Sequence, residues 1–196
     1  MVLILAETQE LYHKRIGEFS MLTKLLKKDF DQVYDLMEQS FPDDEYRPYE
    51  EQKALLDQPA YQIYVEKDCE TQMIRAFLAV WEFDNFAHLE HFAVNPQFRG
   101  NGLGSKALGE LLSLLGKTVC LEVELPNTEI ASRRINFYRR NNMFLNTYPY
   151  MQPPISKGKK PIPLMIMTSN KEVDRESFDK IKKVLYEKVY RYYGNE

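Results

Sequence analysis

The residues best suited to ligand chemistry lie in the stretch HFAVNPQFRGNGLGSKAL, residues 91–108. Three of the chain's 8 glycines, Gly100, Gly102 and Gly104, alternate there between an apolar strand and the start of a helix. A glycine-rich turn that leads into a helix directs several backbone N–H groups toward one point, and the helix dipole adds partial positive charge. Glycine also lets the backbone turn sharply and lets a ligand approach closely. The stretch therefore predicts a phosphate or pyrophosphate site with Arg99 at its rim.

The spacing of these glycines argues against two common phosphate sites. A P-loop requires G-x-x-x-x-G-K-[ST], but Gly104 is followed by Ser105 and Lys106 in the wrong order. A dinucleotide-binding turn requires G-x-G-x-x-G, whereas the spacing here is G-x-G-x-G. An ordinary glycine-rich turn remains the alternative to a phosphate site.

The strand before the glycines carries candidate acid–base residues. Alternation along HLEHFAV predicts one face that holds His88, Glu90, Phe92 and Val94, with His91 on the other face unless a bulge intervenes. His88 has a suitable intrinsic pKa for a base, and Glu90 could serve if partial burial raised its pKa. The alternative is that both only line a cleft, because inward polar side chains are unfavourable unless a cleft receives them.

The elements that must position these residues follow from hydrophobic periodicity. Strands are expected at 21–27, 61–68, 71–83, 86–94, 117–125, 143–151 and 161–169, and helices at 30–41, 49–56, 105–115, 129–141 and near the C-terminus. Asp29 suits a helix N-cap, Asp84 and Asn85 suit a tight hairpin, and Asn142 suits a left-handed helix end. The strand–helix–strand unit at 89–123 should be a parallel, right-handed crossover. The expected fold class is α/β, a mixed sheet with helices on its faces.

Length and composition bound the class of protein. The 196 residues fit one ordinary domain, with 44% apolar and 28% charged residues. A net charge of -3 provides no overall basic field for nucleic acid or an anionic membrane. Cys69 and Cys120 lack zinc-ligand or C-x-x-C spacing, so no metal and a reducing, cytoplasmic setting are expected. Because Met21 begins a plausible natural start, residues 1–20 are set apart as either an extension or a leader added to the natural chain.

Two segments together resemble the GNAT N-acetyltransferase superfamily. VNPQFRGNGLGSKAL is similar to its signature, a strand ending V-x-P followed by R/Q-x-x-G-x-G/A. The matching positions are Val94, Pro96, Arg99, Gly102 and Gly104. INFYRRNNMF is similar to the family's F-Y-x-x-x-G-F, with Tyr138 at the tyrosine and Asn142 in place of glycine. The order of elements over residues 21–169 also resembles the family, which makes the chain look like a bacterial-type member.

This resemblance implies direct transfer of an acetyl group from acetyl-CoA to a primary amine of a small molecule or peptide. It implies a mostly antiparallel sheet, splayed open beside the Val94 strand and covered by helices on both faces. The pyrophosphate would lie on the N–H groups of Arg99, Gly100, Asn101, Gly102, Leu103, Gly104 and Ser105. The backbone of Phe92, Ala93 and Val94 would pair with the pantetheine arm, and the Val94 N–H would polarise the thioester carbonyl. Tyr138 would protonate the leaving thiolate, and family members often place a catalytic carboxylate or histidine near His88.

One departure leaves a second hypothesis open. Ala131 stands where many members carry asparagine, so any such cofactor contact would come from Asn136, Arg133 or Arg134. The alternative function is an acyl-CoA-binding regulatory or structural domain that performs no transfer.

The acceptor side is less defined by the sequence. The acidic loop DDEYRPYEE favours a cationic acceptor if it borders the site, and is otherwise a solvated loop. Tyr148, Tyr150 and Gln152 could form the opposite rim, and KGKK at 157–160 could either touch the cofactor's 3′-phosphate or remain exposed. Beyond the domain at 21–170, the pattern of residues 171–196 predicts an amphipathic helix. This helix should pack either on the domain or on a second subunit, and in the second case the protein would be a homodimer. This helix combines basic and aromatic residues, but its acidic residues reduce the positive charge that would attract nucleic acid. No nucleic-acid partner is therefore expected.

Overall fold

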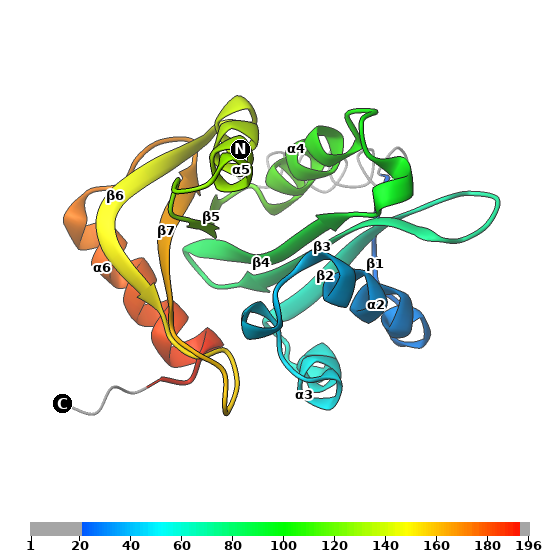
Figure 1. Ribbon diagram of the computed structural model, residues 1–196, viewed down its shortest axis with the longest axis horizontal. Coiled ribbons are helices and arrows are strands. Elements are labelled where there is room, and N and C mark those ends of the chain that lie inside the picture. The colour runs from blue at the N-terminus through cyan, green and yellow to red at the C-terminus, as the bar shows by residue number, and fades with distance from the viewer. Residues whose placement is uncertain (1–20, 193–196) are drawn as a thin grey trace, which may run out of the picture.

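The computed structural model describes residues 21–192, so the expectation for residues 1–20 lies outside the described part of the chain. Its centre is a 7-stranded mixed sheet in the order β1-β2-β3-β4-β5-β7-β6 (Figure 1). The strands are β1 (Leu22–Lys24), β2 (Tyr61–Lys67), β3 (Ile74–Glu82), β4 (Phe86–Val94), β5 (Thr118–Glu124), β6 (Met143–Gln152) and β7 (Ile162–Ser169). The helices are α2 (Phe30–Ser40), α3 (Tyr49–Ala54), α4 (Leu103–Leu115), α5 (Glu129–Arg140) and α6 (Arg175–Val184), which continues into a π-helical turn (Leu185–Val189). The expected α/β class with helices on both faces is confirmed.

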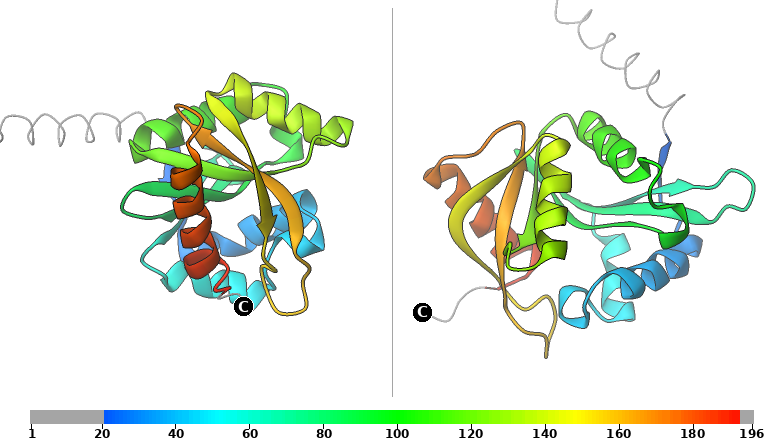
Figure 2. Two further views of the ribbon diagram at one scale, coloured as in Figure 1. Left: turned by 90° about the vertical axis from the view of Figure 1, so that its left-hand side faces the viewer. Right: turned by 45° about the horizontal axis from the view of Figure 1, so that its top comes forward.

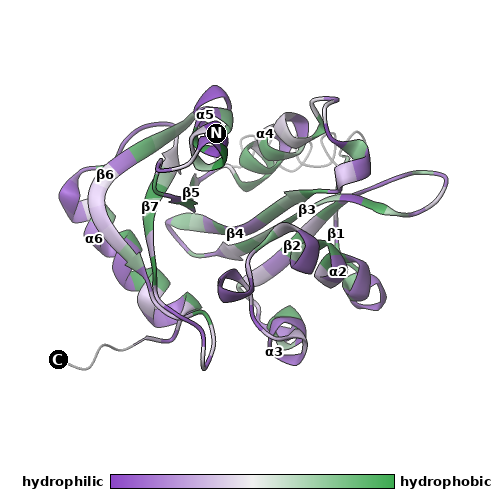
Figure 3. Cartoon of the chain, viewed as in Figure 1, coloured by the Kyte–Doolittle hydropathy of each residue, from purple (hydrophilic) through white to green (hydrophobic). Residues whose placement is uncertain are grey.

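The helices form a layer on each face of the sheet. Helices α4 and α5 lie above the sheet in Figure 1, and α2 and α3 lie below it. Helix α6 runs beside β6 and β7, as both views of Figure 2 show. Strands β3 and β4 are largely hydrophobic, while these covering helices carry hydrophilic residues between their apolar ones (Figure 3). This pattern is typical of a sheet that is buried on both faces.

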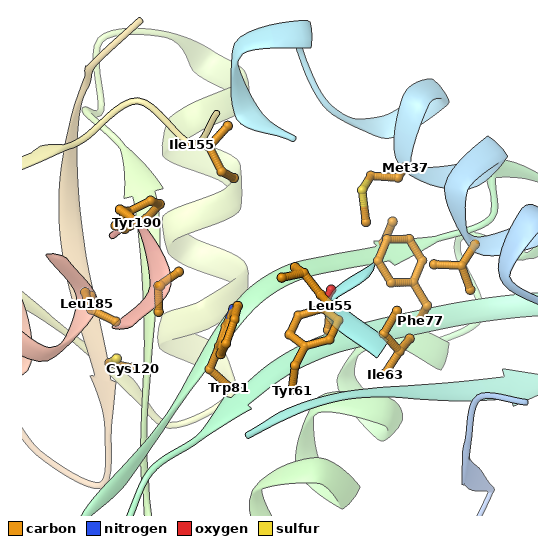
Figure 4. Packing of buried hydrophobic residues seen from close by; sticks show 14 of the residues in the cluster. Met37, Leu55, Tyr61, Ile63, Phe77, Trp81, Cys120, Ile155, Leu185 and Tyr190 are labelled. Carbon is orange, nitrogen blue, oxygen red and sulfur yellow. The ribbon is translucent and has the colours of Figure 1, made fainter. Parts of the chain in front are cut away.

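Two hydrophobic clusters fill the two faces of the sheet. One cluster joins α2, α3 and the C-terminal segment to residues such as Phe77, Trp81 and Cys120 (Figure 4). The other joins α4 and α5 to the opposite face, through residues such as Leu78 and Leu121. Because β3 contributes buried side chains to both clusters, its sequence reads as a continuous apolar run rather than an alternating one.

Strands β4 and β5 form the parallel pair that the crossover predicted. Their register begins at Phe86↔Thr118 and ends at Leu89↔Leu121. Beyond this point β5 continues to pair with β7 as far as Glu124, and β4 continues to pair with β3 as far as Val94. The two strands therefore separate halfway along β4, which splays the sheet at the expected place.

A β-bulge at Glu90 overturns the alternation predicted for β4. His91 pairs with Ala79 of β3 and Leu89 pairs with Val80, so Glu90 is the extra residue. His88 and Ala93 consequently lie on the face of α2 and α3, whereas Phe92 packs on the opposite face. The prediction that one face holds His88, Glu90, Phe92 and Val94 is wrong, because one extra residue reverses the alternation after it.

Residues that favour helix ends predicted some of the observed ends correctly and others incorrectly. Helix α4 begins two residues before the expected Ser105, because Gly102 adopts the left-handed conformation and serves as its N-cap (φ 73°). Asn142 is left-handed as predicted (φ 60°). Asp29 occupies the N-cap position of α2 but makes no capping bond, because its carboxylate accepts a hydrogen bond from Lys67 at 2.6 Å.

Candidate active site

A cavity of about 180 Å³ lies where β4 and β5 separate. Its wall draws on both faces of the sheet, because the gap between the strands interrupts the sheet there. The residues that matter for the chemistry are Glu90 and Phe92 of β4, Glu122 of β5, Tyr138 of α5, Arg99 after β4, and Tyr190 after the π-helical turn. A ligand in this cavity can thus be reached from the α4–α5 side and from the α2–α3 side.

The edge of β4 that faces this gap carries backbone groups that β5 does not pair. The N–H of Asn95 bonds to Arg75 of β3 at 2.8 Å, so alternation turns the backbone groups of Phe92 and Val94 toward the gap. The Nε of Arg99 donates to the Val94 carbonyl at 2.9 Å. The side chain of Arg99 is thereby held at the mouth of the gap, beside the glycine turn.

The glycine turn delivers N–H groups to the same end of β4. Gly100 and Gly102 both have positive φ, at 91° and 73°, which explains glycine at these two positions. The first N–H groups of α4, from Leu103 to Ser105, precede the first helical bond, which runs from Lys106 to Gly102. At Gly104 an added Cβ would lie 3.4 Å from the side chain of Val94, which is close to an ordinary van der Waals contact, so α4 begins directly beside the end of β4.

Tyr138 reaches the cavity from α5, whose N-terminus is capped by Thr128. The residue is 8% exposed, and its ring contacts Phe137 edge-on. Burial raises the pKa of Tyr138 to about 12, although the nearby Arg134 guanidinium opposes the shift. The hydroxyl therefore keeps its proton at neutral pH.

Glu90 does not have the raised pKa expected for a base. Burial disfavours its charge, but the guanidinium of Arg47 lies 2.9 Å away and His91 also contacts it, so the pKa is held well below the usual value. The bulge explains this geometry, because it brings His91 onto the side of the strand where Arg47 approaches. Glu90 is thus a paired carboxylate that is ionised at neutral pH.

His88 lies behind the cavity rather than in its wall. The side chain is completely buried, with Nδ1 3.8 Å from the Cys120 sulfur and Nε2 3.5 Å from Glu122. Burial is the main reason that the pKa of His88 falls to about 4. In the folded protein the pKa of His88 is therefore too low for the role of base that its intrinsic pKa suggested.

Glu122 is the cavity residue that sequence reasoning missed. It lies on β5 and is 8% exposed in its side chain. The hydroxyls of Tyr150 and Tyr190 each donate to one of its oxygens. Burial nevertheless raises its pKa to about 7, against the opposing effect of these two hydrogen bonds. The available signal was a glutamate between Leu121 and Val123 in a mostly apolar strand.

The other expected site residues divide between the cavity and the surface. Gln152 and Arg134 line the cavity, whereas Asn136 is exposed on α5 and Tyr148 packs on Phe178. Lys159 of the basic loop pairs with Asp43 at 2.7 Å, so this loop contacts the acidic loop instead. Within residues 21–192 no cluster of His, Cys, Asp and Glu could hold a metal ion, and no helix is long and apolar enough to span a membrane.

Comparison with known proteins shows which family the chain matches. The family model described as "Acetyltransferase (GNAT) family" matches residues 30–143. A protein from Bacteroides thetaiotaomicron, assigned to the GNAT family of acetyltransferases, is 31% identical, with a TM-score of 0.77 over 86% of this chain and 97% of that chain. Among curated proteins no match was found.

More distant solved structures share the fold. The ribosomal-protein-S18-alanine N-acetyltransferase from Escherichia coli is 22% identical, with a TM-score of 0.54 over 79% of this chain and 96% of its own. A chimera based on the spermidine N-acetyltransferase from Vibrio cholerae is 15% identical, with a TM-score of 0.56 over 76% of this chain and 93% of its own.

Proposed function

Because the chain belongs to the GNAT family of acetyltransferases, we propose that it transfers an acetyl group from acetyl-CoA to a primary amine. The observation that carries this proposal is the cavity at the strand separation. There, a buried carboxylate with a near-neutral pKa and a protonated phenol line one space beside the open edge of β4.

The chain's own groups fit the co-substrate. The backbone of Phe92 and Val94 faces the gap and can pair with the amides of a pantetheine arm, as a neighbouring strand would. The N–H groups at the start of α4 and the helix dipole suit a pyrophosphate, with Arg99 adding charge. Acetyl-CoA would supply the activated acyl group as a thioester. The Val94 N–H is the donor that would meet charge developing on the carbonyl oxygen.

Glu122 is better suited than Glu90 to accept the proton of the amine. An alkylammonium has a pKa of about 10.4, so transfer to a carboxylate whose pKa is about 7 costs roughly 5 kcal/mol. Transfer to Glu90, whose pKa lies below 4.5, would cost more than roughly 8 kcal/mol. Glu122 also lines the cavity, whereas His88 stands behind it. We therefore assign the role of base to Glu122.

Tyr138 is suited to donate a hydrogen bond rather than to give up its proton. With a pKa of about 12, full transfer to a thiolate whose acid has a pKa of about 8.5 would cost roughly 5 kcal/mol. A charge-assisted hydrogen bond from the phenol would still stabilise the leaving sulfur. In the complete step Glu122 first takes a proton from the ammonium and releases it to water. The neutral amine nitrogen then bonds to the acyl carbon, the C–S bond breaks, and the second amine proton passes to Glu122. The released thiolate takes up a proton from Glu122 or from water.

The charges in the cavity wall favour a cationic acceptor. Glu45 and Glu124 line the cavity beside Glu122, and Arg134 pairs with Glu124 at 2.7 Å. Burial raises the pKa of Glu45, so this carboxyl adds less negative charge to the wall than an exposed glutamate would. Two of the solved structures with this fold are named for amine acceptors, a protein alanine and spermidine. We propose a small-molecule or peptide amine as the acceptor class.

Thiol release from acetyl-CoA, measured across a panel of polyamines, aminoglycosides and N-terminal peptides, tests this function. Turnover with at least one amine is expected, and Glu122→Gln should reduce kcat strongly while the protein still binds acetyl-CoA in a thermal-shift assay. A thermal shift without turnover on any amine would favour an acyl-CoA-binding domain. Full activity of Glu122→Gln would show that the base is assigned to the wrong residue.

A further inference from the structure

The C-terminal segment contributes a side chain to the cavity, although it lies outside residues 30–143 that match the family model. This segment comprises α6, the π-helical turn and Tyr190. Tyr190 is 8% exposed and lies in the same buried cluster as Leu185 and Cys120 (Figure 4). Its hydroxyl donates to Oε2 of Glu122, the same oxygen that lies 3.5 Å from Nε2 of His88.

On the basis of the proposed function, the geometry points to Tyr190 as a positioning residue that keeps Glu122 ionised and aimed into the cavity. The C-terminal segment is then part of the active site rather than only a cover for the sheet. Tyr190 acts through Glu122 and needs no contact with either substrate.

The π-helical turn determines where Tyr190 points. The N–H of Tyr190 bonds to the carbonyl of Leu185 at 3.0 Å, which is the five-residue spacing of a π-helix. An α-helix turns by about 100° per residue, and the i→i+5 turn spreads one turn over more residues, so Tyr190 has a different angular position from the one that a regular helix would give it. The sequence thus departs from regular helix at the position where a side chain must reach the cavity, and such departures are frequent at functional sites.

Arg47 ties this segment to the rest of the site. One guanidinium nitrogen donates to Glu90 at 2.9 Å, and the other donates to the carbonyl of Val189 at 3.2 Å. The residue before Tyr190 is therefore fixed to the bulge of β4 by a buried cation. The apolar residues Phe178, Ile181 and Leu185 anchor the same segment in the core.

The groups around Glu122 explain why a second hydroxyl matters. From β4, His88 lies 3.5 Å away, and Glu90 and His91 act on Glu122 through their charges. From β6, Tyr150 donates to Oε1, and from the C-terminal segment Tyr190 donates to Oε2. Burial and the negative charge of Glu90 favour protonated Glu122, whereas the two phenols favour the ionised form.

The pH dependence of Tyr190→Phe tests this role, with Tyr186→Phe as the matched control. Tyr186 lies on the same segment, but its hydroxyl donates to the carbonyl of Met151. In the wild type, kcat/KM should rise with pH through the pKa of Glu122. Loss of one charge-assisted hydrogen bond should move this rise upward by about one pH unit or more, so activity on the acid side falls about tenfold and recovers at high pH. Tyr186→Phe should leave the profile in place.

A loss of the same factor at every pH, with no displacement of the profile, would overturn the assignment. A second readout does not depend on turnover. The ¹³C chemical shift of the Glu122 carboxyl, followed by NMR against pH without substrates, should report a higher pKa in Tyr190→Phe than in the wild type. An unchanged carboxyl titration would refute the role of Tyr190. This outcome is separate from a failure of the proposed function, because Glu122→Gln tests whether Glu122 is the base.

Discussion

Replacement of Arg47 by methionine should destabilise the protein far more than the loss of an ordinary ion pair. The side chains of Arg47 and Glu90 are 6% and 1% exposed, and their atoms approach to 2.9 Å. An exposed pair contributes about 0–1 kcal/mol, whereas removal of one partner from a buried pair costs about 3–5 kcal/mol, because a buried charge remains. Arg47→Met also removes the bond to the Val189 carbonyl. We expect a loss of about 4 kcal/mol in the free energy of unfolding at neutral pH.

Urea unfolding of the wild type, Arg47→Met, Glu90→Gln and the double variant measures this loss and the coupling of the two residues. The double variant should be more stable than the sum of the single effects predicts, by at least about 1 kcal/mol. The pKa of Glu90 is depressed in the folded state, so the pair stabilises the protein above the unfolded pKa, and this contribution is lost as pH falls through the folded pKa. The difference between wild type and Arg47→Met should therefore shrink as the solution is acidified. A loss below about 1 kcal/mol, or strictly additive single effects, would refute the reasoning.

Three further outcomes follow from the site. Tyr138→Phe should lower kcat about 10- to 100-fold, through loss of the hydrogen bond to the leaving sulfur, with little change in the KM for acetyl-CoA; a collapse of acetyl-CoA affinity would assign Tyr138 to binding instead. Gly102→Ala should cost about 1–2 kcal/mol in urea unfolding because φ is 73°, whereas Gly109→Ala, with an equally open Cβ position inside α4, should be neutral or stabilising. Since the pKa of Glu122 is raised from 4.5 to about 7, the wild type should lose up to about 3 kcal/mol relative to Glu122→Gln as pH rises through that interval; parallel stability curves would contradict the raised pKa.

The order of elements was accessible from the sequence because hydrophobic periodicity and turn residues act locally. Asn142 and the glycines at positions 100 and 102 indicated a left-handed backbone, which only certain residues adopt easily. The structure has positive φ at all three positions. Asp29 shows the limit of such local signals. Its side chain could cap a helix, but a lysine 38 residues away along the chain binds it instead. Only the three-dimensional structure brings Lys67 there.

The candidate site was harder to predict because its chemistry depends on burial and on distant partners. Tyr138 and the turn at 99–105 were found through a resemblance, and the structure brings them to one end of β4. The acid–base residues were not found in the same way. The pKa of Glu90 depends on Arg47, 43 residues away, and that of Glu122 depends on hydroxyls from β6 and from the C-terminal segment. No spacing rule within one strand contains this information.

The bulge at Glu90 also allows the length of β4 to vary by one residue. Leu89 pairs with Val80 and His91 pairs with Ala79, so the flanking residues already follow the alternation of β3 and only Glu90 is extra. Deletion of Glu90 would make the pairing regular and would leave His91 and Ala93 facing α2 and α3 and Phe92 facing α4 and α5. Both hydrophobic clusters would keep their side chains, but Arg47 would lose its partner. Deletion of Glu90 should therefore destabilise the protein mainly through the unpaired charge of Arg47, as Glu90→Gln should, rather than through a change of packing in the core.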